Sequence, residues 1–461
     1  MLTESFVDAV AAVVGADQVL RDQATRHAYG TDALQRGHPA DLVVRPAATS
    51  EVAAVARLCH QARIPLVPRG AGTGYTGGAV PVHGGVVLSL ERLDRILEID
   101  EENLLAVVQP GVITGVLQAA VEARGLFYPP DPQSLAESSI GGNIAECAGG
   151  PRAFKYGVTR RYVLALEAVL PDGQVIRTGS KAVKNVVGYD LTQLLVGSEG
   201  TLAIVTEATL RLVPRPPAVA TLRACFADVA AAALGVSAVL RRRVVPAALE
   251  LVDQDSLDAV AGYLGERLAP EGTGALLLIE VDGVAEAVAA EAALVAEACR
   301  QAGALEVLLA DNDQQRDQLW RVRRALSYAL RPIAPRKINN DVVVPRGRVP
   351  ELFALVERLR QRHRLRMPCF GHAGDGNIHV NIMIDPADAD QLARAERAVA
   401  ELFAGVVALE GSISGEHGIG VSKAPYLGLE LSPPAIALMR RVKRAFDPEG
   451  ILNPGKIFPP P

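Results

Sequence analysis

The segment PRGAGTGYTGGA, residues 68–79, places five glycines directly after the predicted strand IPLVPRG. Glycines let successive backbone amides crowd together into a concavity that binds an anion such as a diphosphate. The pattern G-x-G-x-x-G occurs at Gly72, Gly74 and Gly77, but a Rossmann fingerprint continues into a helix. Here the loop continues into VPVHGGVVLSL, which has the pattern of a strand. The Rossmann fold is therefore excluded, and the loop alone indicates either a phosphate cradle or a plain connection.

Around this loop, helical and strand patterns alternate. Residues 1–35 read as a helical lead-in, and helices are expected at 50–62, with Ser50 as N-cap, and at 114–124. The segment ALEAVLPDGQVIRTG predicts a hairpin that turns at Asp172-Gly173. Further strands are expected at 41–46, 64–70, 85–90, 95–100, 104–111 and 201–216.

The proline-rich piece VPRPPAV, residues 213–219, is the best candidate for a domain boundary. Beyond it, Ala-rich helical segments alternate with strands, which favours an α+β domain with helices on one face of an antiparallel sheet. The tail returns to glycine-rich sequence. We therefore divide the chain into 1–217, 218–410 and 411–461.

Charge and cysteine content narrow the functional classes. The formal net charge of −5 argues against a nucleic-acid binder. The five cysteines form no CxxC pair, which favours a reducing compartment and excludes the usual iron–sulfur runs, so electrons would leave through another molecule. A secretory signal and a long apolar run are absent from the sequence, so we expect a cytoplasmic protein, with peripheral contact at the inner face of the membrane left open.

Two glycine-flanked motifs carry histidines. In GHAGDGNIHVNI, residues 371–382, His379 and Asn381 would share one face of a strand, and the preceding bend could return His372 beside them. A catalytic metal site needs a third ligand and an open position, and SGEHGIG offers Glu416 next to His417. The residues alone leave open a metal site or structurally bound histidines.

Further segments with many small residues are PPDPQSLAESSIGGNIAECAGG (129–150), KYGVTRRYV (155–163), VGSEGTLAIVTEATL (196–210) and the tail FDPEGILNPGKI (446–457). Together with residues 68–79, they resemble the FAD-binding oxidoreductases of the vanillyl-alcohol oxidase (p-cresol methylhydroxylase, PCMH) type. More narrowly, they are similar to the group of glycolate oxidase catalytic subunits, D-lactate dehydrogenases and D-2-hydroxyglutarate dehydrogenases. The resemblance extends from Asp41 to the C-terminus.

The resemblance implies an α+β fold in which a two-subdomain, PCMH-type FAD-binding domain (1–217) is followed by a substrate or cap domain (218–410) and a C-terminal segment (411–461) that returns to the FAD domain. FAD would be non-covalent, because Tyr75 stands in the first loop where tethering relatives carry a histidine. The implied cofactor residues are Arg69, Gly70, Ala71, Gly72, Thr73, Gly74, Gly77 and Gly78 at the diphosphate, Pro130, Asp131, Ser138, Gly142, Asn143, Gly149 and Gly157 along the cofactor, Gly200, Ile204 and Val205 at the adenine end, and Asn453 toward the isoalloxazine ring.

For the substrate side, the resemblance implies one divalent metal on His372, His379 and Glu416, most commonly zinc, with manganese or iron as alternatives. His417 matches the position of the general base for oxidation of a D-2-hydroxy acid, with hydride passing to flavin N5. The remaining implied residues are Arg323 and Ser327 at the substrate carboxylate, Lys337 as a weaker binding residue, and Asn381 as an orienting group.

The substrate and the electron acceptor are open. Asn339 stands where the 2-hydroxyglutarate enzymes have a lysine, which favours a small monocarboxylate, D-lactate or glycolate. The expected acceptor is a quinone, a cytochrome, an electron-transfer flavoprotein or an iron–sulfur subunit, and a homodimer is one option for assembly. The alternatives are a D-2-hydroxyglutarate dehydrogenase, a non-catalytic FAD-binding subunit and the ether-lipid synthase branch of the fold.

Overall fold

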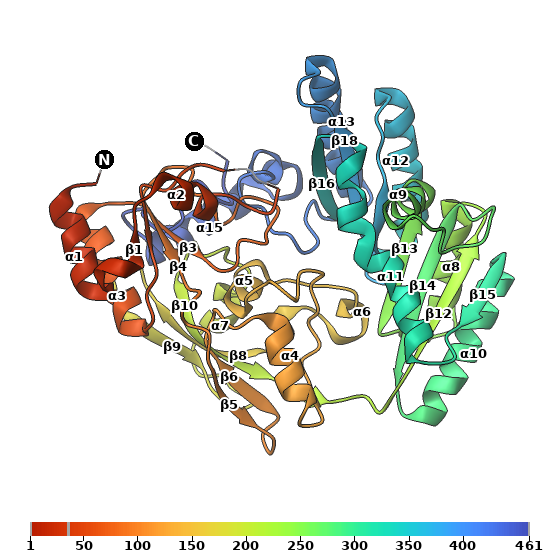
Figure 1. The fold of residues 1–461 in the computed structure, drawn as a ribbon, viewed down its shortest axis with the longest axis horizontal. Helices are drawn as coiled ribbons and strands as arrows, with labels where there is room; N and C mark the ends of the chain where they lie inside the picture. Colours follow the sequence, from red (N-terminus) through yellow and green to blue (C-terminus); the bar gives the residue numbers. More distant parts are fainter. Residues whose placement is uncertain (1, 35–36, 460–461) are drawn as a thin grey trace. The chain divides into compact units, whose positions relative to one another are not determined.

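The computed structural model describes residues 2–34 and 37–459, and the chain forms two compact units (Figure 1). Unit 1 comprises Met1–Gly149, Val158–Arg215 and Glu416–Pro461, and unit 2 comprises Gly150–Gly157 and Pro216–Gly415. None of the helices in the described ranges is long and apolar enough to cross a bilayer.

Unit 1 contains a four-stranded sheet of order β1-β2-β4-β3, in which β2, β4 and β3 are parallel. Its strands are β1 (Val19–Leu20), β2 (Leu42–Val44), β3 (Leu66–Arg69) and β4 (Val86–Ser89). Helices α1 (Glu4–Val14) and α3 (Thr49–Ala62) pack their apolar faces on it, burying Val10, Val52 and Val55 together with Leu88. Helix α2 (Gln23–Tyr29) lies between β1 and β2 in the chain.

The predicted Ser50 cap of α3 is wrong. The helix begins at Thr49, and its N-cap, Ala48, makes no side-chain cap bond. Instead, the carboxylate of Glu51 in the first turn accepts the amide of Ala47, just before the helix, at 2.8 Å.

A second sheet of unit 1 is antiparallel, with the order β5-β6-β10-β8-β9. Its strands are β5 (Ile96–Asp100), β6 (Leu105–Val108), β8 (Val163–Val169), β9 (Val175–Gly179) and β10 (Ile204–Arg211). The hairpin β8–β9 confirms the predicted turn, since Asp172 Oδ1 accepts the amide of Gln174 at 2.9 Å and Gly173 has φ +85°.

The remaining strands and helices complete unit 1. They are β7 (Leu126–Phe127) paired with β11 (Val213–Pro214), and helices α4 (Thr114–Glu122), α5 (Ile140–Glu146), α7 (Leu191–Leu195), α14 (Leu427–Glu430) and α15 (Pro433–Phe446). The tail is joined to β3, because the amide of Leu66 donates to Ile451 and the amide of Asn453 donates to the carbonyl of Leu66, both at 2.8 Å.

Unit 2 is built on a seven-stranded antiparallel sheet of order β15-β12-β14-β13-β17-β18-β16. The strands are β12 (Ala218–Phe226), β13 (Ala248–Asp253), β14 (Ala275–Gly283), β15 (Glu306–Leu309), β16 (Arg336–Val343), β17 (Cys369–His372) and β18 (Asn377–Ile384). Its helices are α6 (Ala153–Tyr156), α8 (Val229–Arg241), α9 (Gln254–Leu264), α10 (Ala285–Gln301), α11 (Asp313–Ala329), α12 (Val349–His363) and α13 (Ala389–Ala408).

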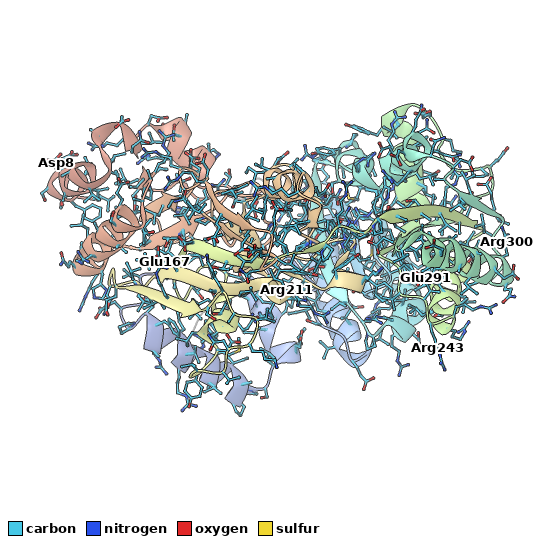
Figure 2. The ribbon with its side chains drawn as sticks, turned by 90° about the horizontal axis from the view of Figure 1, so that it is seen from below. Asp8, Glu167, Arg211, Arg243, Glu291 and Arg300 are labelled. Atoms are coloured by element: carbon cyan, nitrogen blue, oxygen red, sulfur yellow. The ribbon has the colours of Figure 1, made fainter. Side chains whose placement is uncertain are left out.

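The helices of unit 2 pack on both faces of this sheet, so the expectation that they cover one face is wrong. On one face, α9 and α11 enclose a core that contains Cys225, Leu276 and Leu278. The alternate residues of these strands point to the other face and contact α8, where a side chain on Gly235 would meet Phe226 and Leu277. Helix α10 is amphipathic, and its Arg300, labelled in Figure 2, is exposed. Burial of both faces explains why the central strands are almost continuously apolar.

Candidate functional site

The strand register of unit 2 places several polar residues side by side on the sheet face that α11 covers. Glu250 of β13 is opposite His372 of β17, and Asp341 of β16 is opposite His379 of β18. Phe370 is also opposite His379, and it lies two residues before His372, on the same face. All five side chains are buried, so the sheet places two imidazoles and two carboxylates together away from water.

Glu250 bridges a histidine and an arginine. Its Oε1 lies 2.6 Å from His372 Nδ1, and its Oε2 accepts from Arg323 Nε at 2.5 Å. Burial by itself would raise the pKa of Glu250, but the charges of His372 and Arg323 lower it to about 2. Since the carboxylate is ionised and can only accept, His372 Nδ1 is its donor, and Nε2 is the nitrogen that can bind a metal when the imidazole is neutral.

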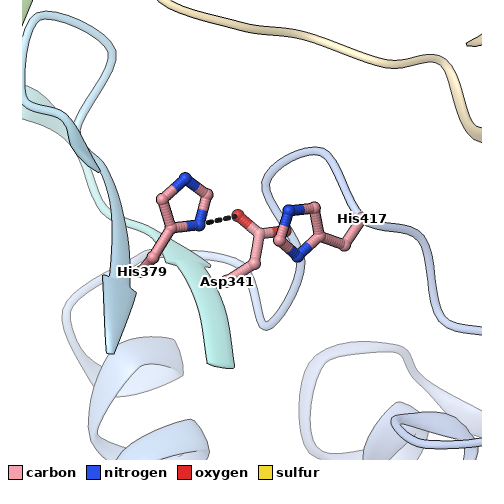
Figure 3. Close-up of side chains that lie close together, drawn as sticks. All are labelled: Asp341, His379 and His417. Carbon is pink, nitrogen blue, oxygen red and sulfur yellow. Dashed lines mark ion pairs between the residues drawn. The ribbon is translucent and has the colours of Figure 1, made fainter. Parts of the chain in front are cut away.

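Asp341 holds the end of the segment that precedes Glu416. Its Oδ1 accepts from Asn377 Nδ2 at 2.6 Å, and its Oδ2 accepts the amide of Gly415 at 2.9 Å. Gly415 is required here, because a Cβ would collide with the Asn377 side chain. Asp341 Oδ1 also lies 3.8 Å from His379 Nδ1, the ion pair marked in Figure 3.

His372 and His379 form a suitable pair of metal ligands. Their rings are nearly perpendicular with centroids 5.4 Å apart, and each offers a nitrogen within 4.8 Å of the other. Two imidazoles with a carboxylate suit zinc, manganese or iron, and the buried Glu250 bond is the outer support that metal-binding histidines usually have. The third predicted ligand, Glu416, belongs to unit 1 and directly follows Gly415.

Three predicted substrate residues accompany this cluster in unit 2. Arg323 is buried in α11, with its guanidinium 5.2 Å from the centre of the Phe370 ring, whereas its neighbours Arg321 and Arg324 are exposed. Ser327 follows one helical turn later and is half-buried. Asn381 is fully buried and accepts from Asn339 Nδ2 at 2.7 Å.

Lys337 lies on the same sheet face as Asn339, two residues earlier on β16. Burial, assisted by the charge of Arg331, lowers its pKa to about 8. Lys337 therefore changes its charge near pH 8.

In unit 1, the loop between β3 and β4 fits an anion. Gly72 and Gly77 have φ values of +74° and +83°, and a Cβ on Gly72 would collide with the Arg69 guanidinium folded beneath the loop. Within the described part of the chain, the amides of residues 70–74 donate no hydrogen bond. A Cβ on Gly74 would meet no protein atom within 4 Å. Successive backbone amides that donate no hydrogen bond, next to free space, are the expected form of a diphosphate site.

Two other predicted FAD residues of unit 1 lie against this loop, Gly142 beside Gly70 and Asn453 beside Gly78. Asn453 donates from Nδ2 to the carbonyls of Gly78 and Glu199, at 2.9 and 2.8 Å, while its buried Oδ1 has no partner in residues 2–34 and 37–459. An unused buried acceptor of this kind fits a donor on a bound cofactor. Of the predicted cofactor residues, only Gly157 belongs to unit 2.

Gly157 belongs to unit 2 because its segment is anchored there. Lys155 Nζ donates to the carboxylate and the carbonyl of Asp282, and Tyr156 Oη donates to the same carboxylate at 2.6 Å.

His417 lies in a loop that is bound to the glycine-rich loop of unit 1. Thr76 Oγ1 donates to the carbonyl of His417 at 3.0 Å, and the Tyr75 ring meets the imidazole edge-on with centroids 5.0 Å apart. The amide of Val421 donates to the carbonyl of Thr76 at 2.9 Å. His417 Nε2 is 3.8 Å from Glu416 Oε1, so the two adjacent side chains remain close.

Sequence reasoning missed Glu250, Asp341 and Glu199. Glu250 lies inside the apolar strand ALELVD, where a carboxylate can be buried only with partners, and this was the available signal. Asp341 gives a similar signal in INNDVVV. Glu199 had no such signal, because its segment is glycine-rich and irregular.

Comparison with known proteins identifies the family. The model of the C-terminal domain of FAD linked oxidases matches residues 215–457, and that of an FAD binding domain matches residues 40–179. The chain belongs to the FAD-linked oxidases. The first model covers more than half of the chain, and together the two span both units.

Curated relatives of the family match this chain nearly end to end. The glycolate oxidase subunit GlcD of Bacillus subtilis is 43% identical over 459 residues, covering 99% of this chain and 97% of the relative. The D-lactate dehydrogenase of Anaerostipes hadrus is 38% identical, covering 90% and 89%. The D-2-hydroxyglutarate dehydrogenase of Stutzerimonas stutzeri is 35% identical, covering 99% and 100%. The chain is thus an FAD-linked oxidoreductase of this group.

Solved structures confirm the predicted fold class. p-Cresol methylhydroxylase superimposes with a TM-score of 0.83 at 20% identity, covering 98% of this chain and 96% of the other. An alkyldihydroxyacetonephosphate synthase gives a TM-score of 0.76 at 20% identity, covering 98% and 86%. At these identities the likeness concerns the fold, which is the PCMH-type architecture.

Proposed function

We propose that this protein is an FAD- and metal-dependent dehydrogenase that oxidises D-lactate or glycolate to the 2-oxo acid. The observation that carries the proposal is the buried set of Glu250, His372 and His379, because two adjacent imidazoles, one of them oriented by a carboxylate, match the needs of a catalytic metal. Zinc is our first choice of metal, followed by manganese and iron. When bound, a divalent cation makes the hydroxyl group of a chelated 2-hydroxy acid more acidic.

Glu416 is our choice for the third ligand. Asp341 accepts the amide of Gly415, and the next residue in the chain is Glu416. Consecutive Cα atoms are about 3.8 Å apart, so the Glu416 side chain would begin close to the sheet face that carries the histidines.

Arg323 would bind the substrate carboxylate. Glu250 holds the guanidinium through Nε, and a guanidinium can fork onto both oxygens of a carboxylate. Ser327, one turn later on α11, would support the same carboxylate, and Asn381 would orient the substrate from the sheet.

His417 would accept the hydroxyl proton at an imidazole nitrogen. An imidazole is suited to this task near neutral pH. The amides of residues 70–74 would hold FAD non-covalently, and FAD would supply the acceptor for the hydride from the same carbon. A separate acceptor would take the two electrons, and we propose a quinone, a cytochrome, an electron-transfer flavoprotein or an iron–sulfur subunit for this role. The relatives named as glycolate oxidase subunits support a partner of this kind.

A second candidate substrate is D-2-hydroxyglutarate. Asn339 offers no charge for a second carboxylate, but Lys337 lies two residues earlier on the same sheet face. The 35% identity to the relative from Stutzerimonas stutzeri supports this candidate.

A dye-linked assay tests the proposal. The FAD-loaded protein is stripped with a chelator, reloaded with zinc or manganese, and assayed for dichlorophenolindophenol reduction with D-lactate, glycolate, D-2-hydroxyglutarate and, as a control, L-lactate. We expect metal-dependent reduction with D-lactate or glycolate. Equal rates with and without metal would contradict the proposal, and activity confined to D-2-hydroxyglutarate would select the second candidate.

A further inference from the structure

A buried cluster of two glutamates and two lysines lies beneath the His417 loop of unit 1. Glu199 Oε1 and Oε2 accept the amides of Ile419 and Gly420, each at 2.7 Å. Glu199, Lys423 and Lys456 are nearly inaccessible to solvent, with 6%, 3% and 3% exposure. The two amides therefore point at a carboxylate that water does not reach, which makes these bonds strong.

Glu146, the last residue of α5, completes the cluster. A side chain on Gly418 would collide with the Glu146 carboxyl, and a Cβ on Gly78 would lie 2.7 Å from its Oε1. Burial and the charge of Glu199 raise the pKa of Glu146 well above its ordinary value, although Lys423 opposes the shift. Burial also raises the pKa of Glu199, but the amides of Ile419 and Gly420 and the charges of the two lysines oppose this shift. Because both Glu199 oxygens accept backbone amides, Glu199 is the ionised acceptor and Glu146 the protonated member.

The cluster joins segments that are far apart in the sequence. Glu199 directly precedes Gly200, its carbonyl accepts from Asn453 Nδ2 at 2.8 Å, and Lys456 Nζ donates to the carbonyl of Val80 at 2.6 Å. Thr76 holds the other side of the loop through the carbonyl of His417. The His417 loop is thereby bound to the same segments that carry the predicted FAD residues.

We infer that Glu199 is a positioning residue: its carboxylate fixes the backbone after His417 and so sets the direction of the imidazole. This role rests on the proposed function of His417 as the base. Glutamate is needed because both of its oxygens are used, whereas a glutamine would present one acceptor and one NH₂ group to two amide donors. The loop would then retain one bond and lose its fixed geometry.

Two measurements on the FAD-loaded protein test the inference. Hydrogen exchange of peptides covering residues 418–423 should accelerate in Glu199→Gln but not in Glu207→Gln, a matched change in β10 at a half-buried carboxylate 4.0 Å from Arg177. Turnover of Glu199→Gln should fall about tenfold, the effect of one buried donor left unsatisfied, with the flavin spectrum and KM retained. In the His417→Ala background, the same change should have no further effect on turnover.

The outcomes distinguish the role of the Glu199 bonds in holding the loop from the role of His417 as the general base. Unchanged exchange at 418–423 would show that the Glu199 bonds do not hold the loop. An equal loss of turnover in both backgrounds would show that Glu199 acts on something other than His417. Full turnover of His417→Ala would contradict the proposed base and with it the positioning role, whatever the exchange result. If Glu199→Gln does not fold, Thr76→Val removes the opposite tether, and faster exchange with lower turnover is again expected.

Discussion

Glu250 and His372 face each other across two antiparallel strands of unit 2, with Oε1 2.6 Å from Nδ1, and both side chains are buried. The same carboxylate accepts from Arg323 Nε. One acidic residue thus fixes the tautomer of a predicted metal ligand and the position of a predicted substrate ligand.

Replacing Glu250 with glutamine should weaken metal binding about tenfold to a hundredfold, because His372 loses the charged acceptor that orients it. A competition titration with a zinc-sensitive dye measures this affinity, and the FAD content should not change. Glu280→Gln is the control, since Glu280 is also buried in the sheet but accepts from Thr221 and Trp320. Equal zinc affinities for the two variants would remove Glu250 from the metal site.

His372→Ala and His379→Ala should each reduce bound metal to about a tenth or less after dialysis, because a site with one imidazole holds zinc poorly. Elemental analysis beside the flavin spectrum is the measurement. His363→Ala removes a buried histidine of α12 that belongs to no predicted site, and should keep its metal. Metal retained by either site variant would show that the ion binds elsewhere.

His417→Ala should lower turnover about a hundredfold, the usual contribution of a general base. Steady-state kinetics with D-lactate measure this, while absorbance and elemental analysis should show that FAD and metal remain. The exposed His27 of α2 provides the control, since His27→Ala should turn over like the parent. Parent-like kinetics in the His417 variant would assign the proton to another group.

Gly74→Ala tests the diphosphate cradle. A Cβ there would meet no protein atom within 4 Å, so the fold should keep its unfolding temperature in the FAD-free state. The methyl group would instead obstruct FAD. We expect FAD affinity to fall about tenfold or more, because the backbone at Gly74 could no longer approach the diphosphate closely. Gly428→Ala, in the exposed helix α14, is equally free of clashes and should bind FAD normally. Unaltered FAD affinity in Gly74→Ala would place the diphosphate elsewhere.

If Lys337 binds substrate, the pH dependence of KM should differ between D-2-hydroxyglutarate and D-lactate. Its pKa is lowered to about 8, so the side chain is charged below that pH and neutral above it. If it binds a second carboxylate, KM for D-2-hydroxyglutarate should rise as pH increases through about 8, whereas KM for D-lactate should not follow this group. Parallel pH profiles with the two acids measure the difference. Profiles that move together would exclude Lys337 from substrate selection.

The sequence was most informative where local chemistry decides the structure. The Asp172-Gly173 hairpin was predictable because a short polar turn connects two alternating strands. The Ser50 cap failed because the helix begins at Thr49 after the N-cap Ala48, and the Glu51 carboxylate binds the amide of Ala47 just before the helix. The position of a helix start depends on such competing partners, and the sequence pattern does not rank them.

The site was predictable in part. Glycine-flanked histidines indicated His372 and His379, and the register confirms that they share a face. Their support was not predictable, because Glu250 is about 120 residues away in the chain and meets His372 only through the order of strands in the sheet. The same holds for Glu199, whose partners at 419 and 420 follow it by more than two hundred residues.

The most direct test of the account is the metal dependence of the FAD-loaded enzyme. Protein that is stripped until elemental analysis finds no divalent metal should keep its flavin spectrum and lose D-lactate or glycolate oxidation, and one equivalent of zinc or manganese should restore it. Full turnover by protein that retains FAD and is free of metal would contradict the account.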